Sequence, residues 1–413
     1  MDFEHSAETR KRADEVRAFM DGELLPRNRD WRAWAAANAA DPEWMAPLRA
    51  RARAAGLWNM GLTRLPEGRE GTPLSNLAFA PIAEAMGGLS WAPFIFNCHA
   101  PDLPNMITLL DEATPEQQER YLDPLLEGRM RSAFAMTEPD NGSSDARNIA
   151  MRVDRTAKGY VLNGRKWFAS GAAHPDCRFL IVIGALAEAG PRSGHTAFIL
   201  PMDTPGLTLT RRLNYLCLDE PIGELDFEDV EVPADALLGA EGQGFAVAQT
   251  RLGPARVHHC MRAIGLAETV LELMVARAGE RRTFNRRLDE YDTVQGWIAR
   301  SRVEIEQARL IVLKCAWLLD RDGHRGAWRE VSIAKIAVPQ MLSAVVDRAL
   351  QLFGAMGGTE RTPLPEAMAW ARAFRIFDGP DEVHLRQIFK QEEPAKTPLA
   401  ENPHICEPAP QGA

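Results

Sequence analysis

The stretch VSIAKIAVPQMLSAVVDRALQLF, from Val331 to Phe353, carries apolar residues that recur by threes and fours. This spacing is typical of a helix with one buried face. Two earlier runs share the period. Their apolar positions are Val257, Met261, Ile264, Leu271, Met274 and Ala278 in one run, and Val294, Ile298, Ile305, Ala308, Val312, Cys315 and Leu319 in the other. Three such helices predict a bundle, and their length leaves apolar surface for a partner subunit.

Upstream of the bundle, residues 131 to about 235 have a strand-like pattern and not a helical one. Short apolar or alternating runs are separated by turn residues such as Asn163-Gly164, Pro205-Gly206 and Pro221. The runs are Ser132–Met136, Tyr160–Leu162, Phe179–Ile183, Thr196–Leu200, Leu207–Thr210 and Leu225–Phe227. Strands at this spacing, without helical patterns between them, indicate a compact antiparallel sandwich or barrel.

Residues 1 to about 130 are helical in pattern. Thr114-Pro115-Glu116-Gln117 predicts a helix start, because Thr114 can cap it, Pro115 suits the first helical position and Gln117 completes a capping box. The sequence therefore predicts an α+β protein. Its parts are an N-terminal all-α domain (1–130), a middle β domain (131–240), a C-terminal helical bundle (241–393) and a flexible tail (394–413).

Composition narrows the class of protein. A net charge of −9 over 413 residues argues against nucleic acid as the main partner. Six single cysteines, none in a CxxC pair, suggest neither a zinc site nor a disulfide framework, and fit a reducing setting. No apolar run reaches the ~20 residues that span a bilayer, and the charged N-terminus resembles no signal peptide. We expect a cytoplasmic protein without membrane insertion.

Common catalytic signatures are mostly absent. The glycine-rich run Gly239–Gly244 lacks a strand–helix context for dinucleotide binding. Ser332-Ile-Ala-Lys335 matches SxxK but lies inside a helical run, so we attribute it to chance. His258-His259 opens an amphipathic helix without a third ligand, which does not support a metal site.

The remaining segments resemble one family, the acyl-CoA dehydrogenases. FAMTEPDNGSSD (134–145) resembles its TEPxxGSD loop with one extra serine, and NGRKWFASG (163–171) resembles NGxKxWITN with one residue fewer. RRTF (281–284) resembles RxxF, QLFGAMGG (351–358) resembles QxxGGxG, and RIFDGPDEV (375–383) resembles the segment that contains IYEGTSEI. The motifs occur in order and in register over roughly residues 7–392. The variants KWFASGA and DGPDEVH look most like the branch of family members ten and eleven.

This resemblance implies an N-terminal α-helical domain, a middle β-barrel or sandwich domain and a C-terminal four-helix bundle. It also implies FAD bound between domains and subunits of a homodimer or a dimer of dimers (a homotetramer). The implied activity belongs to fatty acid metabolism, in β-oxidation. An acyl-CoA substrate loses a proton from Cα and a hydride from Cβ, the hydride passes to flavin N5, and electron-transferring flavoprotein is the acceptor.

By the same resemblance, Asp378 stands where the family has its catalytic glutamate, and its backbone N–H would bind the thioester oxygen. We expect an apolar setting that strengthens Asp378 as a base; the alternative is that Asp-Gly-Pro only forms a turn. Aspartate reaches roughly 1.5 Å less than glutamate, so loop or substrate must move closer. Glu382 is the second candidate for the base.

The other site residues also follow from the resemblance. Those that line the flavin or the thioester arm are Phe134, Met136, Thr137, Gly142, Ser143, Trp167, Ser170, Pro380 and Glu382. Ser143, Arg256 and Gly379 would border the substrate. Hydroxyl groups can bond the heteroatoms of a flavin and glycine permits close approach, whereas a loop turn and a core tryptophan are the alternatives for 134–143 and Trp167.

A third group would reach the FAD of the neighbouring subunit. Arg281 suits a pyrophosphate because guanidinium binds phosphate in a bidentate manner; a solvated helix end is the alternative. Phe284 belongs to the same motif, and Gln295 replaces the family glutamine whose position is Asp292 here. The residues that would cradle the adenosine half are Gln351, Gly354, Ala355 and Gly357, for which a plain helix C-cap is the alternative.

Two other functions stay open from the sequence. An oxidase or monooxygenase of the same fold, resembling nitroalkane oxidase, also fits an aspartate base. A non-catalytic scaffold of this fold predicts that Asp378→Ala leaves biological function intact.

Overall fold

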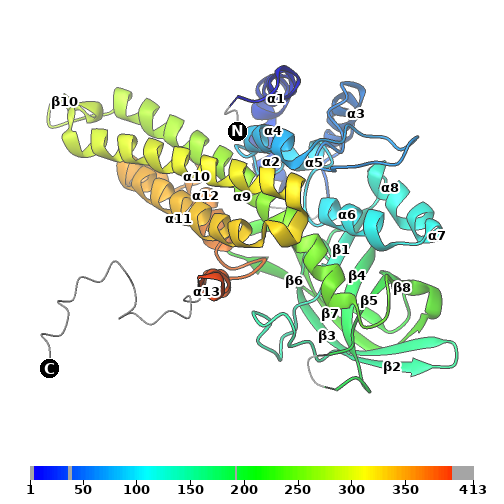
Figure 1. Cartoon of the computed structure of the whole chain (residues 1–413). Coiled ribbons are helices and arrows are strands. Elements are labelled where there is room, and N and C mark those ends of the chain that lie inside the picture. Colours follow the sequence, from blue (N-terminus) through cyan, green and yellow to red (C-terminus); the bar gives the residue numbers. More distant parts are fainter. Residues whose placement is uncertain (1–3, 36–39, 191–192, 393–413) are drawn as a thin grey trace, which may run out of the picture.

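The computed structural model describes residues 4–35, 40–190 and 193–392 (Figure 1). The tail predicted at 394–413 lies outside these residues. Helices make up the N-terminal part, and the predicted capping box is present: Thr114 accepts a hydrogen bond from the Gln117 N–H and the Gln117 side chain accepts one from the Thr114 N–H. The α-helices here are α1 Ala7–Phe19, α2 Asn28–Ala35, α3 Met45–Ala54, α4 Asn76–Met86, α5 Ala92–Ile95, α6 Asp102–Glu112, α7 Pro115–Gln117 and α8 Asp123–Leu126. Short 3-10 or π segments, η1 Met20–Leu24, η2 Leu25–Arg27 and η3 Gln118–Leu122, join some of them.

The middle part is one sheet with the order β6-β7-β3-β2-β4-β5-β8, to which β1 adds by pairing with β4. Its strands are β1 Arg131–Ala135, β2 Arg152–Thr156, β3 Gly159–Ala169, β4 Cys177–Leu186, β5 His195–Pro201, β6 Leu207–Tyr215, β7 Leu218–Pro233 and β8 Leu237–Leu238. A short 3-10 turn, η4 Ala234–Ala236, precedes β8. The prediction of a purely antiparallel sheet is wrong in two places, because β4 runs parallel to both β1 and β2.

Two predicted turns lie inside strands. Asn163-Gly164 belongs to β3, where the register with β7 shifts between Leu162 and Gly164, and Pro221 belongs to β7. Gly164 has φ of +145°, a conformation that suits glycine and accommodates the bulge. The strands are therefore longer than their apolar runs, because a bulge lets a strand continue through residues that usually end it.

The C-terminal part contains the three predicted long helices, α9 Gly244–Glu280, α10 Asp292–Gly326 and α11 Trp328–Phe353. All predicted apolar positions on them are buried except Ile298, which is partly buried. At the outer end of α9 and α10 lies the hairpin of β9 Arg282–Thr283 and β10 Arg286–Arg287, followed by η5 Leu288–Glu290. The turn η6 Gly354–Gly358 leads to α12 Leu364–Ala373 and α13 Asp381–Gln391, which both pack on α11.

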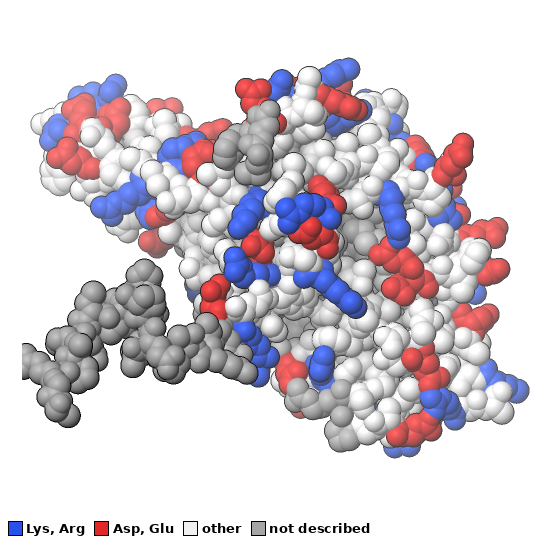
Figure 2. All heavy atoms as spheres, in the orientation of Figure 1, with Lys and Arg blue, Asp and Glu red and all other residues white. Residues whose placement is uncertain are grey.

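The sheet has an apolar core on each face. One core runs from the N-terminal helices through α9–α12 and takes in Phe134, Phe179 and Ile181 from the sheet. The other lies on the opposite face and includes Leu162, Phe198 and Leu225 from the sheet. Figure 1 shows the bundle projecting away from the sheet, so that the β9–β10 tip stands far from β1 and β3. On the face in Figure 2, basic and acidic side chains mingle at this tip.

Two glycines let α4 and α9 touch through their backbones. A Cβ on Gly265 would lie 1.8 Å from the Glu84 carbonyl oxygen, and one on Gly87 would lie 2.1 Å from the Arg262 carbonyl oxygen. No rotamer change can relieve a clash with backbone, so this contact requires glycine and sets the position of α9 against the N-terminal helices.

We therefore expect Gly265→Ala to lower the free energy of unfolding by about 1–3 kcal/mol or more, despite the better helix propensity of alanine. Gly279→Ala on the same helix is the matched control, since nothing lies within 4 Å of its Cβ position; it should stabilise by about 0.5–1 kcal/mol. Urea unfolding of both variants checks this, and equal stabilisation by the two would contradict the contact.

Candidate active site

Asp378 sits in the segment between α12 and α13 with a left-handed backbone, φ +55°, followed by Gly379 at φ +103°. Two buried cations hold this segment by its carbonyl groups. Arg256 Nε on α9 donates to the Asp378 carbonyl oxygen at 2.7 Å, and Lys335 Nζ on α11 donates to the carbonyls of Phe374 and Phe377 at 2.6 and 2.8 Å. Since a left-handed aspartate is strained, these bonds from two helices fix the turn.

The surroundings of the Asp378 carboxylate are cationic, which corrects the expectation of an apolar setting. Arg251, Arg256 and Lys335 are 5%, 7% and 1% exposed. Burial lowers the pKa of each, to about 10 for Arg251, and the negative charge of Asp378 opposes this fall in all three. Buried cations need a counter-charge, and Asp378 is the carboxylate whose charge acts on all three.

Two histidines, His259 largely buried and His384 fully buried, complete the surroundings of Asp378. His259 on α9 has Nε2 3.5 Å from Asp378 Oδ2, and its ring packs against Phe374 and Phe377. His384 on α13 has Nδ1 3.2 Å from Ser332 Oγ. Burial lowers the pKa of His384 to about 3 and that of His259 well below its ordinary value, so both rings are neutral at pH 7.

The Ser332–Lys335 spacing, which we attributed to chance, has a structural role. It places both side chains on the face of α11 that supports the Asp378 segment: Lys335 through two carbonyls and Ser332 through His384. A helical i, i+3 pair faces one direction. The pair thus braces the segment.

The segments predicted to hold the flavin come together at the ends of β1 and β3. The Phe134 N–H donates to the Ser170 carbonyl at 3.3 Å, and the Trp167 N–H donates to the Thr137 carbonyl at 3.0 Å. Met136 lies between these contacts, and Gly142 and Ser143 follow in the loop, where Ser143 Oγ accepts from the Glu138 N–H at 3.1 Å. Within the described residues, Trp167 Nε1 is buried without a hydrogen-bond partner, which suits a site that a bound ring system completes.

A buried ion pair that the sequence analysis missed holds these two segments together. Lys166 Nζ lies 2.7 Å from Glu138 Oε1 and donates to the Met136 carbonyl at 3.0 Å. Glu138 also accepts the N–H groups of Ala150 and Met151, both at 2.8 Å. Burial lowers the pKa of Lys166 to about 8 although Glu138 raises it. Glu138 lies in the motif 134–145 and Lys166 in the motif 163–171. Their places in these motifs were the only feature of the sequence that could have indicated the ion pair.

Arg251 joins the flavin segments to the Asp378 segment. Its guanidinium carbon lies 4.0 Å from the centroid of the Phe134 ring, and its Nε donates to Asn105 Oδ1 at 2.9 Å. Asp378 is its strongest acidic influence. Nothing in the sequence marks Arg251 as buried, so only the packing of α9 against β1 and α6 reveals it.

Pro380 and Glu382 lie where α13 begins. Pro380 caps this helix, and Glu382 is exposed in its first turn. Asp381 is tied to Arg375, with Nε to Oδ2 at 2.8 Å. Of these three neighbouring carboxylates, Asp378 is the one whose charge acts on all of Arg251, Arg256 and Lys335.

The third predicted group is not brought to this place. Arg281, Phe284 and Gln295 lie at the outer end of α9 and α10, with Phe284 90% exposed. The Gln351–Gly357 segment, with Gly354 and Ala355, lies at the same end, because Phe353 stacks under Arg277 at 5.4 Å. Figure 1 shows this end far from β1 and β3, so one chain cannot assemble all the predicted cofactor contacts.

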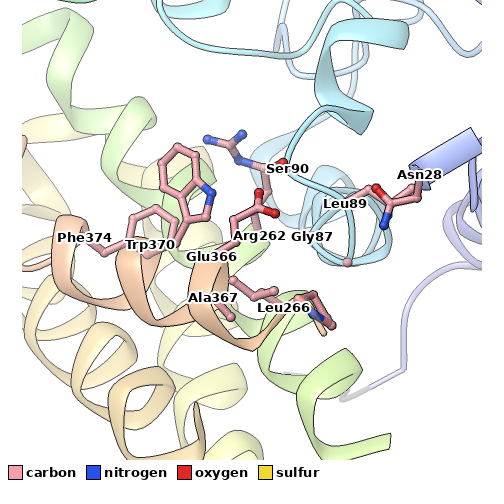
Figure 3. A pocket seen from close by; sticks show the side chains of 12 residues that line it. Asn28, Gly87, Leu89, Ser90, Arg262, Leu266, Glu366, Ala367, Trp370 and Phe374 are labelled. Carbon is pink, nitrogen blue, oxygen red and sulfur yellow. The ribbon is translucent and has the colours of Figure 1, made fainter. Parts of the chain in front are cut away.

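A pocket opens beside the Asp378 segment, between α9, α12 and the turn after α4 (Figure 3). Phe374 and Arg262 line it and also contact His259. Leu266, Ala367 and Trp370 give it apolar walls, and Glu366 adds a carboxylate. The pocket and the Asp378 surroundings thus share walls.

Buried neutral histidines predict acid sensitivity. Burial lowers the pKa of His99 to about 4 and those of His258 and His384 to about 3. Below pH 6.5 these histidines bind protons in the unfolded chain but stay neutral in the folded one. The free energy of unfolding therefore falls as the pH falls, by about 1.4 kcal/mol per pH unit for each ring. Urea midpoints should decrease steeply from pH 7 to 5. His258→Gln should remove the share of one ring, about 1.4 kcal/mol per pH unit, and a flat profile would contradict the assignment.

Family models match this chain in three consecutive parts: the acyl-CoA dehydrogenase N-terminal domain over residues 6–129, the middle domain over 133–230 and the C-terminal domain over 242–392. The chain belongs to the acyl-CoA dehydrogenase family, and its fold and its class as an oxidoreductase are those of the family. The resemblance drawn from the five motifs is therefore confirmed.

Individual relatives agree. The probable acyl-CoA dehydrogenase FadE2 of Mycobacterium tuberculosis is 44% identical, covering 95% of this chain and 97% of its own. Acyl-CoA dehydrogenase family member 11 of Gallus gallus is 42% identical over 91% of this chain, and family member 10 of Mus musculus is 46% identical over 84%. This chain spans only 49% and 33% of those two longer proteins.

Solved structures show the same relationship. A putative acyl-CoA dehydrogenase from Mycobacterium abscessus superposes with a TM-score of 0.90 at 43% identity, covering 94% of this chain and 99% of that one. Butyryl-CoA dehydrogenase from Megasphaera elsdenii gives 0.81 at 26%, covering 95% and 100%. A chain in the structure of the electron transferring flavoprotein of Acidaminococcus fermentans has the same TM-score, identity and coverage. In the described residues, no helix has the length and hydrophobicity to cross a bilayer.

Proposed function

We propose that this protein is an FAD-dependent acyl-CoA dehydrogenase that forms a trans-2-enoyl-CoA, with Asp378 as the base. The observation that carries the proposal is the position of Asp378: its charge acts on three buried cations, and Arg251 links it to the strand that begins the flavin loop. Family membership supports the class of reaction, and this geometry supports Asp378 as its base.

The chemistry divides between the cofactor and the chain. FAD, when bound, supplies the acceptor for the hydride that leaves Cβ. The Asp378 carboxylate takes the proton from Cα, and the thioester oxygen needs a donor as enolate charge develops there. Among the described residues the Asp378 N–H has no hydrogen-bond partner, so it is free to be that donor. Trp167, Thr137 and Ser170 would hold the ring system beside it.

The shared walls support the pocket beside Phe374 as the place for the far part of the acyl chain. Its lining of Leu266, Ala367 and Trp370 suits a hydrocarbon, while Arg262 and Glu366 also offer polar contacts (Figure 3). We propose electron-transferring flavoprotein as the electron acceptor and fatty acid β-oxidation as the process. The five described cysteines are free thiols, which supports the reducing cytoplasm as the location.

The proposal is tested by mixing purified protein anaerobically with straight, branched, hydroxylated and aromatic acyl-CoAs and following flavin absorbance. Bleaching by at least one class, with slow reoxidation in air, is expected. An aspartate base also suits an oxidase that resembles nitroalkane oxidase. Rapid peroxide formation after reduction would identify the oxidase activity. A colourless protein that takes up no FAD would contradict both the dehydrogenase and the oxidase assignments.

We further propose that a second copy of the chain completes the FAD site as a homodimer or a dimer of dimers. The Arg281 and Gln351–Gly357 groups lie together but far from Phe134, as a site shared between subunits requires. Within the described residues, Arg282, Arg286 and Arg287 have partners at this tip, whereas the Arg281 side chain has none.

Arg281→Ala should therefore weaken FAD retention about tenfold or more, because a charge-assisted contact to phosphate contributes about 1.5–3 kcal/mol. Flavin content after gel filtration measures it. Arg282→Ala is the control, since its guanidinium already donates to the Asn285 carbonyl. Equal flavin content in the Arg281 variant and the wild type would remove this assignment.

A further inference from the structure

One face of the Asp378 carboxylate is turned toward a neutral histidine. His259 Nε2 lies 3.5 Å from Asp378 Oδ2, and the two side chains are only 12% and 17% exposed. The imidazole ring packs against both Phe374 and Phe377, with centroid distances of 5.9 and 4.9 Å, and these two rings also contact each other. It therefore cannot swing away from the carboxylate without losing its aromatic contacts.

The proton of this ring can be assigned from its other nitrogen. Arg262 Nη2 lies 2.6 Å from His259 Nδ1. A guanidinium group has donors only, so Nδ1 must be the acceptor. Burial lowers the pKa of His259 well below its ordinary value and Arg262 lowers it further, so the ring carries a single proton. That proton must be on Nε2, the nitrogen that faces Asp378.

In the described part of the chain, no other side chain forms a hydrogen bond or an ion pair with this carboxylate. Arg256 and Lys335 are bound to carbonyls of the segment. Arg251 acts on Asp378 through charge but is committed to Asn105 and the Phe134 ring, and His384 faces Ser332. These groups fix the backbone around Asp378, while His259 is the group placed to orient its carboxylate.

We propose that His259 is a positioning residue for the base, set in the Nε2–H form by Arg262 and donating to Asp378 Oδ2 when substrate is bound. The present 3.5 Å is longer than a hydrogen bond, and such bonds often shorten in the substrate complex. A donor fixes the direction of the short aspartate side chain and favours its ionised form. A proton relay is not part of the proposal, because Nδ1 is occupied by Arg262.

This inference rests on the proposed function, and two substitutions separate the ring from its proton. His259→Phe keeps an aromatic ring against Phe374 and Phe377 but has no donor. His259→Gln has an amide N–H at similar reach but no ring. His258→Gln is the matched control, because the neighbouring ring packs edge-on against Phe79 and both its nitrogens lack partners in the described residues.

The measurement is the rate of anaerobic flavin reduction at saturating acyl-CoA from pH 6 to 9, with flavin content and the substrate dissociation constant. His259→Phe should slow flavin reduction about 10–10²-fold. The acid limb, which is the fall of the reduction rate at low pH, should move to higher pH. The dissociation constant of the substrate should change less than threefold. His259→Gln should recover most of the rate and the original limb, and His258→Gln should match the wild type.

Three results would overturn the inference: a normal rate in His259→Phe, equal slowing with an unmoved acid limb in both His259 variants, or greater slowing in His259→Gln than in His259→Phe. If His259→Phe loses its flavin, Arg262→Met tests the proposal instead. It leaves His259 in place but removes the donor that keeps the proton on Nε2. The acidic side of the pH–rate profile should therefore move in the same direction, and an unchanged profile contradicts the proposal. Asp378→Asn is measured alongside: if it reduces flavin normally, the proposed function fails first, independently of His259.

Discussion

Asp378→Asn is expected to fold, bind FAD and lose reduction of the flavin by acyl-CoA by about 10²–10⁴-fold or more, the range that general base catalysis supplies. The amide has the same shape but cannot take up the α-proton at neutral pH. The bonds that hold the segment go to the carbonyls of Asp378, Phe374 and Phe377, so the turn should survive the substitution. Stopped-flow absorbance of the bound flavin under anaerobic conditions measures the loss.

Glu382→Gln is the matched control for Asp378→Asn. Glu382 is a nearby carboxylate but is exposed on α13, so its variant should reduce at the wild-type rate. If the Glu382 variant were inactive and the Asp378 variant active, the base would have to be reassigned. Asp378→Glu tests reach, since it extends the carboxylate by roughly 1.5 Å. We expect partial activity or a changed preference for acyl chain length.

Lys166→Met should have the largest effect on stability. It leaves Glu138 buried with two backbone donors but without its counter-charge, and breaking one half of a buried ion pair costs about 3–5 kcal/mol. The Met136 carbonyl also loses its donor, so the flavin loop should loosen and FAD should dissociate more readily. Urea unfolding and flavin content after gel filtration measure the two effects.

A double-mutant cycle makes the Lys166 prediction sharper. Glu138→Gln removes the charge and keeps one acceptor oxygen, which can serve the Ala150 N–H or the Met151 N–H but not both. Adding it to Lys166→Met should therefore recover part of the lost stability. Lys158→Met is the control, because Lys158 is exposed on the β2–β3 turn. A Lys166 variant as stable as that control would show that the pair contributes nothing.

The element types followed from local patterns, whereas strand lengths and directions did not. The period of three and four placed the faces of α9, α10 and α11 correctly, since a long amphipathic helix has one way to bury its stripe. The sheet was harder, because Asn163-Gly164 and Pro221 usually end strands and here lie inside them. The parallel pairings of β4 depend on partners distant in sequence, which no short window contains.

The site divides in the same way. Asp378, Phe134 and Trp167 could be predicted because each belongs to a contiguous motif. Arg251, His259 and Lys335 could not, since an arginine, histidine or lysine on a helix is usually exposed or simply part of a packed face. Only the neighbouring elements bring these three beside Asp378, and the charges of Arg251 and Lys335 make the expected apolar setting a cationic one.

By itself, then, the sequence determined the order of helical and strand-forming parts, the family and the candidate base, because these depend on residues close together in the chain. The tertiary structure alone decided which charges surround Asp378, which histidine faces it and which cofactor contacts a single chain cannot reach. Those properties depend on side chains from α9, α11, α13 and β1 together. The distances between these side chains and their burial are set only when the four elements pack against one another.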